Sequence, residues 1–106
     1  MFHHHGHLTL SPDATDEQLE GILDALLGLP GQVDGLLEAR VARDAGLAHG
    51  NASVRFHMVF DSADSWRAYG SHPAHVAVVT EHIKPVLVGK AMVQHDDADL
   101  RVATRP

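Results

Sequence analysis

Two segments of the chain alternate between apolar and polar side chains, which is typical of β-strands with one buried face. In residues 52–60 every second side chain is apolar, namely Val54, Phe56, Met58 and Phe60. Residues 2–10 show the same period, with one face formed by Phe2, His4, Gly6, Leu8 and Leu10 and the other by His3, His5, His7 and Thr9. Further strands are predicted over residues 36–43 and 90–96.

A helical period follows the first strand. Thr15 and Gln18 have the spacing of a capping box, in which each residue satisfies a backbone N–H of the other. Apolar residues then recur at the spacing of one helix face, at Leu19, Ile22, Leu23 and Leu26. Gly28 and Pro30 are expected to end this helix.

Two shorter helices are predicted after the strand at residues 52–60. Asp61 or Ser62 is expected to cap the first, and Pro73 to begin the second, which Pro85 interrupts. The resulting order β-α-β-β-α-β predicts an α+β, ferredoxin-like fold, with an antiparallel sheet and its helices on one face. The uncovered face would expose Val41, Val59 and Val93, so we expect the chain to pair with itself as a homodimer.

Composition and charge restrict the domain count, the kinds of partner and the location that we expect. A chain of 106 residues favours one domain, here expected over residues 1–98 with a polar tail at 99–106. The formal charge of −6 argues against a nucleic-acid partner, and no stretch is apolar enough for a membrane span. The absence of cysteine fits a reducing cytoplasm.

The stretch Tyr69-Gly70-Ser71-His72-Pro73-Ala74-His75 combines a phenol with two imidazoles at a helix–helix corner. Together with the preceding Ser65-Trp66-Arg67-Ala68 and the later Glu81-His82-Ile83-Lys84-Pro85, it resembles the stress-responsive dimeric α/β-barrel (Dabb) family. The opening of the family is matched by His4, Leu8, Leu10, Pro12-Asp13-Ala14-Thr15 and Leu29-Pro30-Gly31. The resemblance covers about residues 2–96 and implies a dimeric barrel.

One branch of that family contains olivetolic acid cyclase, a cofactor-free enzyme that closes a linear polyketide by aldol chemistry. The resemblance to this branch implies that Tyr69 and His75 are catalytic and that His4 lies in the pocket. A further pocket histidine of that branch is absent, because the matching position is Val54. A base and a hydrogen-bond donor are the groups that enolisation of a carbonyl compound requires.

We expect no cofactor and a small apolar or aromatic ligand. Its pocket is predicted to involve the residues Gly6, Leu8, Leu23, Leu26, Val54, Phe56, Met58, Trp66 and His72. The missing side chain at Gly6 is expected to enlarge the pocket near His4. Each polar residue also has a structural interpretation: Tyr69 could cap the corner, His72 could bond a free backbone group, and His75 could bridge to a strand.

The opposite face of the first strand carries histidines. His3, His5 and His7 alternate there, and His57 is expected beside them on a neighbouring strand. This set could bind a metal ion such as Zn²⁺, but a hydrated polar dimer interface is the favoured explanation and no metal is assigned. Three functions remain open: a polyketide-cyclase type of enzyme, a non-catalytic stress-response ligand-binding or assembly protein, and a cofactor-free monooxygenase of the same fold.

Overall fold

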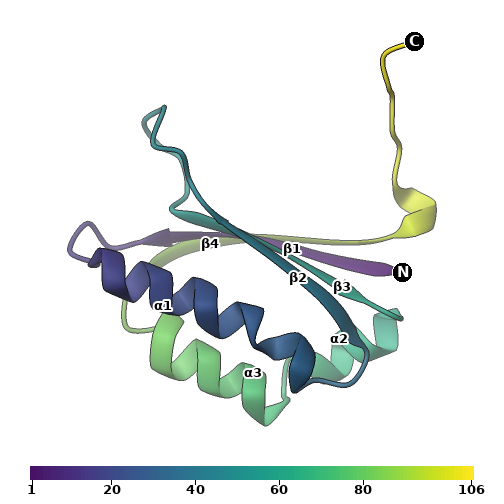
Figure 1. Ribbon diagram of the computed structural model, residues 1–106, viewed down its shortest axis with the longest axis horizontal. Coiled ribbons are helices and arrows are strands. Elements are labelled where there is room, and N and C mark those ends of the chain that lie inside the picture. The colour runs from purple at the N-terminus through teal and green to yellow at the C-terminus, as the bar shows by residue number, and fades with distance from the viewer.

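The computed structural model describes residues 1–106 and contains a four-stranded antiparallel sheet in the order β2-β3-β1-β4. The strands are β1 (Phe2–Leu10), β2 (Leu36–Arg43), β3 (Val54–Phe60) and β4 (Leu87–Asp96). The helices between β1 and β4 lie on one face of the sheet (Figure 1); they are α1 (Asp16–Leu27), α2 (Ala63–Tyr69) and α3 (Pro73–Val78), with the short turns η1 (Leu29–Gly31) and η2 (Val79–Ile83). The turn η3 (Asp97–Asp99) follows β4 on the other side of the sheet. The predicted α+β, ferredoxin-like fold is confirmed.

The helix starts follow the local sequence signals. Thr15 accepts a hydrogen bond from the backbone N–H of Gln18, whose side chain accepts from the backbone N–H of Thr15, so the predicted capping box is complete. Ser62 caps α2 by accepting from the backbone N–H of Ser65, which identifies the cap among the two candidates. Because these backbone groups are satisfied locally, each helix begins at a fixed residue.

One apolar core lies between the sheet and the helices. The predicted stripe of α1 is buried there, and so are all four alternating residues of β3. Ile22, Met58 and Phe60 have no exposed surface. This core fixes the register of the sheet, since a slip by one residue would turn the buried side chains of β3 to solvent.

The prediction that Val41 lies on the uncovered face is wrong. A bulge between Leu36 and Glu38 shifts the pairing of β2, so that Val41 stands opposite Phe56 and packs against the core. Val93 does lie on the uncovered face and is 60% exposed. The last strand also begins earlier than expected, at Leu87 rather than at residue 90.

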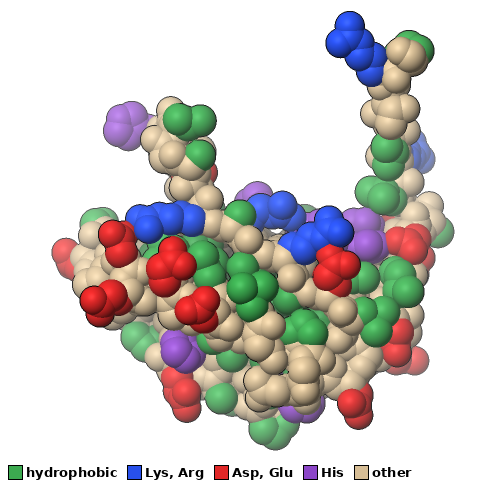
Figure 2. Space-filling view, in the orientation of Figure 1, with side chains coloured by type: hydrophobic (Ala, Val, Ile, Leu, Met, Phe, Trp, Pro, Cys, Tyr) green, Lys and Arg blue, Asp and Glu red, His purple; other side chains and the backbone are tan.

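Charge separates between the two faces. Figure 2 shows lysine, arginine and histidine side chains gathered over the uncovered face of the sheet, and acidic side chains over α1. The connection between β2 and β3 and the residues after η3 both project beyond the uncovered face (Figure 1).

No helix combines the length and the apolar character needed to cross a membrane. The division at residues 98 and 99 stays a prediction.

Candidate active site

A cavity of about 480 Å³ lies between the sheet and the helices. Its apolar wall consists of Leu8, Leu26, Phe56, Trp66, Val79, Ile83, Leu87 and Met92. Its polar lining consists of His4, Arg67, Tyr69, His75, Lys90 and Gln94, with the backbone of Gly70. An apolar pocket of this size with a few converging polar groups is typical of a small-molecule site. A second hollow, of about 580 Å³, lies under the β2–β3 connection and contains none of these groups.

Tyr69 is the last residue of α2 and is 4% exposed. Its ring packs between Phe60 and His75, with ring centroids 5.1 Å and 4.2 Å away. Burial raises the pKa of Tyr69, so the side chain remains a phenol that can donate a hydrogen bond. Its hydroxyl makes no hydrogen bond to protein, which removes the structural interpretation that Tyr69 caps the corner through its hydroxyl.

His75 lies in the first turn of α3, which begins at Pro73 as predicted. Its Nδ1 is 3.1 Å from the carbonyl oxygen of Gly70. Because a carbonyl can only accept, Nδ1 donates and Nε2 carries the lone pair of the neutral ring. Burial lowers the pKa of His75 against the opposing effect of this hydrogen bond, so the ring is neutral at neutral pH.

His4 lies on the helix-covered face of β1. The side-chain amide of Gln94 donates to His4 Nδ1 over 2.9 Å, so the neutral ring carries its proton on Nε2. Burial, with smaller contributions from His75 and His5, lowers the pKa of His4 to about 4. His4 therefore offers an N–H donor, in the opposite protonation pattern to His75.

The unpaired polar atoms of these three residues are not fully buried, and all three residues line the cavity. Tyr69 Oη, His75 Nε2 and His4 Nε2 have no protein partner, yet no side-chain nitrogen or oxygen in the molecule is both fully buried and unpaired. The His4 and Tyr69 ring centroids are 6.3 Å apart, with Tyr69 also against His75. The residues that line this one apolar cavity thus include one acceptor and two donors.

The structure divides the other predicted pocket residues into two groups. Leu8, Leu26, Phe56 and Trp66 line the cavity, whereas Leu23, Val54 and Met58 belong to the packed core and do not line it. His72 is also outside the cavity lining, because its Nδ1 accepts a hydrogen bond from the backbone N–H of Ala74 and caps α3. That is the structural role weighed for it from the sequence.

The expectation that Gly6 enlarges the pocket is wrong. A Cβ built on Gly6 would stand 2.1 Å from Cζ of Phe56 and 2.6 Å from the sulfur of Met92. The space beside His4 is therefore filled by these two side chains. The glycine permits close packing of an aromatic ring on the strand and adds no open volume.

Sequence reasoning missed the contributions of β4 and η2. Lys90, Met92 and Gln94 follow the two-residue period of β4 and project onto the helix-covered face, a signal present in the sequence. Val79 and Ile83 come from η2, a π-helical turn in which the N–H of Lys84 donates to the carbonyl of Val79 over 2.8 Å. Such turns are frequent at functional sites and have no simple sequence signal.

Comparison with known proteins agrees with this architecture. The stress responsive A/B barrel domain (Dabb) family matches residues 2–96. A dimeric ferredoxin-like protein of unknown function from Thermobifida fusca is similar in structure, with a TM-score of 0.78 and 31% identity over 89% of this chain and 88% of that one. No curated protein matches the sequence.

Two more distant structures share the fold. The Arabidopsis thaliana protein At3g17210 has a TM-score of 0.80 and 17% identity, over 96% of this chain and 100% of that one. The hydroxynitrile lyase of Passiflora edulis has a TM-score of 0.78 and 13% identity, over 99% of this chain and 96% of that one. At these identities the likeness concerns the fold.

Proposed function

The chain belongs to the Dabb family, and we propose that it is a cofactor-free acid/base enzyme acting on a small carbonyl compound in the cavity. The observation that carries this proposal is the set of three unpaired polar atoms on one apolar cavity, at Tyr69, His75 and His4. A structural corner would use these atoms in protein hydrogen bonds. Here the protein instead fixes each ring from its other side or by packing.

The proposed first step is enolisation. His75 Nε2 takes a proton from the carbon next to a carbonyl, the C–H electron pair moves into the new C–C double bond, and the carbonyl oxygen becomes an oxyanion. Tyr69 donates a hydrogen bond to that oxygen, and His4 Nε2–H is available as a second donor. Gly70 stabilises the resulting imidazolium by accepting from Nδ1.

The second step makes the reaction a cyclisation. The enolate carbon attacks a second carbonyl of the same molecule, a C–C bond forms, and the new alkoxide takes the proton back from His75 Nε2. No oxidant or reductant is consumed. The apolar wall suits an aromatic or polyketide-like substrate. The fold is shared with the Passiflora edulis enzyme, whose name places it among the lyases.

Lys90 favours a substrate with an anionic end. It lies on the cavity lining and makes no ion pair or hydrogen bond within the protein. Arg67, also on the lining, is by contrast paired with Asp64 at 2.7 Å. A free ammonium at the edge of an apolar cavity suits a carboxylate or enolate group of the ligand.

We further propose a homodimer that pairs the uncovered sheet faces. That face exposes Val93, and the β2–β3 connection and the C-terminal residues project from the same side, where they could contact a second copy (Figure 1). The 31% identical relative is described as dimeric. A two-fold pairing would cover the exposed apolar surface with an identical patch. Location in the cytoplasm stays a prediction.

The experiment is deuterium exchange in D₂O, followed by ¹H NMR, at the acidic carbon of a panel of aryl ketones and β-keto acids. It tests enolisation whatever the final product is. We expect exchange above the buffer rate. Tyr69→Phe should lower it about 10²–10³-fold through loss of the oxyanion donor, and His75→Ala about 10²–10⁴-fold through loss of the base.

His82→Ala is the matched control, because His82 is an exposed histidine of η2 outside the cavity. It should exchange like the unaltered protein. Binding of a panel compound without exchange, or exchange that Tyr69→Phe and His75→Ala leave unchanged, would contradict the proposal. The former result would favour the non-catalytic ligand-binding alternative.

A further inference from the structure

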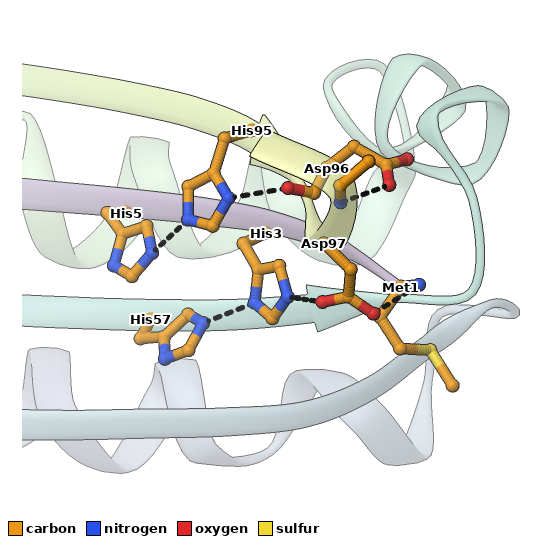
Figure 3. A network of polar contacts seen from close by, with 8 residues as sticks. Met1, His3, His5, His57, His95, Asp96 and Asp97 are labelled. Atoms are coloured by element: carbon orange, nitrogen blue, oxygen red, sulfur yellow. Dashed lines mark hydrogen bonds and ion pairs between the residues drawn. The ribbon is translucent and has the colours of Figure 1, made fainter. Parts of the chain in front are cut away.

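A cluster of four histidines lies on the uncovered face, on the opposite side of the sheet from the cavity. His3 and His5 come from β1, His57 from β3 and His95 from β4. Figure 3 shows their rings turned toward one another. The rings of His5 and His57 stack with centroids 4.1 Å apart, and those of His3 and His95 at 4.8 Å. Polar contacts join His3 to His57 and His5 to His95, pairs that are 54 and 90 positions apart in the chain.

One pair of ring nitrogens in this cluster has the spacing of zinc ligands, and a third ring nitrogen lies close by. Ring nitrogens of His3, His5 and His95 all lie within 4.8 Å of one another. Nε2 of His5 is 3.3 Å from Nε2 of His95. Two imidazole nitrogens bound tetrahedrally to zinc at about 2.0–2.1 Å are themselves about 3.3 Å apart. The fold therefore holds these two side chains at the separation that a shared ion requires.

Outer hydrogen bonds orient two of the three rings. His3 Nε2 is 2.5 Å from a carboxylate oxygen of Asp97, and His95 Nδ1 donates to the backbone carbonyl of Asp96 over 2.9 Å. Each acceptor holds a proton on the nitrogen that faces it, which leaves the lone pair on Nδ1 of His3 and Nε2 of His95. In the metal-free chain Nδ1 of His3 accepts from Nε2 of His57 over 2.9 Å, and an ion would take the place of that proton. A carboxylate or carbonyl behind a histidine is the usual outer shell of a metal site, and it strengthens the ligand.

An acidic side chain lies at one end of the cluster. Asp97 lies behind His3, where it also pairs with the amino terminus of Met1 at 2.9 Å. At the other end His57 has no acidic neighbour and stands directly opposite Arg40, which pairs with Glu38. The ligands that combine close spacing with an acidic neighbour are His3, His5 and His95.

We infer that His3, His5 and His95 form a binding site for one divalent transition-metal ion per chain, of the zinc class, with Asp97 as a positioning residue. Imidazole ligands suit Zn²⁺, Ni²⁺ and Cu²⁺, whereas Mg²⁺ and Ca²⁺ require oxygen ligands. His7, a candidate from the sequence, is outside the group, and His95 was not foreseen. The site is independent of the cavity chemistry, because it lies on the other face of β1.

The test is titration of the metal-free full chain with Zn²⁺ by calorimetry, with elemental analysis of the dialysed complex and visible absorption of the Co²⁺ form. We expect one ion per chain and an intense tetrahedral Co²⁺ band. His95→Ala should weaken Zn²⁺ affinity by at least about tenfold, and Asp97→Asn by about 10–100-fold. His95 is the decisive position, since it lies far in sequence from the N-terminal histidines.

His7→Ala is the matched control, because it removes an exposed imidazole from the same strand. It should leave the affinity unchanged, and the metal-free unfolding midpoint of each variant shows that the fold persists. Weakening by His7→Ala together with unchanged affinity in His95→Ala would overturn the inference in favour of chelation by the N-terminal histidines as a flexible peptide. Half an ion per chain, no retained zinc, or a Co²⁺ form without the intense band would also overturn it.

Discussion

The two faces of β1 place the same side chain in two different environments. His4 points into the apolar layer under the helices, where burial lowers its pKa to about 4 and Gln94 fixes its proton. His3 and His5, its neighbours in sequence, point to the uncovered face, where they contact other histidines and Asp97. Because side chains of a strand alternate between its two faces, three consecutive histidines can differ in burial, in pKa and in hydrogen-bond partners.

The separation depends on what covers each face. Helices exclude water from the side of His4 and isolate it among Phe56, Trp66 and Tyr69. On the other side no layer of helices covers the imidazoles, and they contact one another across neighbouring strands. Stability should therefore reside in the covered face, and assembly and metal binding in the uncovered one.

The largest expected effect is on stability, where a substitution on the covered face should cost far more than one on the uncovered face. Met58→Ala, on the covered face, should lower the free energy of unfolding by about 2–5 kcal/mol, because Met58 is fully buried and its removal leaves a cavity. Val93→Lys, on the uncovered face, should leave the folded chain intact because a lysine there can reach solvent. Denaturant unfolding measures both.

The same pair tests assembly. Sedimentation velocity should show that Val93→Lys turns the proposed dimer into monomers, because opposed sheet faces would bury like charges. Met58→Ala should remain dimeric wherever it is folded. A Val93→Lys protein that still sediments as a dimer would mean that another surface joins the two copies.

The sequence predicted the layers well because they rest on local patterns. The alternation of β3, the capping box at Thr15 and Gln18, and the proline start of α3 each act within a few residues, and all three appear in the structure. Of the site, the sequence identified Tyr69, His75 and His4, which the fold brings to one cavity.

The missed features depend on pairing between distant strands. The bulge in β2 turns Val41 toward the core, and the register of β4 brings His95 beside His3. Neither can be read from a single strand, since a one-residue shift exchanges the two faces. The filled space at Gly6 likewise depends on Phe56 and Met92 from two other strands.

A smaller effect on stability is expected when glycines on the two faces are each replaced by alanine. Gly6→Ala should destabilise the protein by about 1–3 kcal/mol, because its Cβ would collide with Phe56 and Met92 on the covered face. Gly89→Ala is the control on the uncovered face, where the nearest atom, Cβ of Thr9, is at an ordinary contact distance of 3.7 Å. Thermal unfolding of the two variants should separate them; equal midpoints would show that Phe56 and Met92 move aside freely.

The smallest expected effect is the pH dependence of enolisation, which tests whether the covered face keeps its base neutral. Burial lowers the pKa of His75 below the ordinary 6.5, so Nε2 keeps its lone pair until the solution is more acidic than that value. The charged or titratable groups around it come from α2, α3 and its cap, β1 and β4: Arg67, Tyr69, His72, His4 and Lys90. Exchange rates should stay flat from about pH 8 to 6.5 and decline only below it, and the decline should vanish in His75→Ala. A decline centred at or above pH 6.5 would mean that the proton acceptor is a solvent-exposed imidazole, which would contradict the proposal that His75 on the covered face is the base.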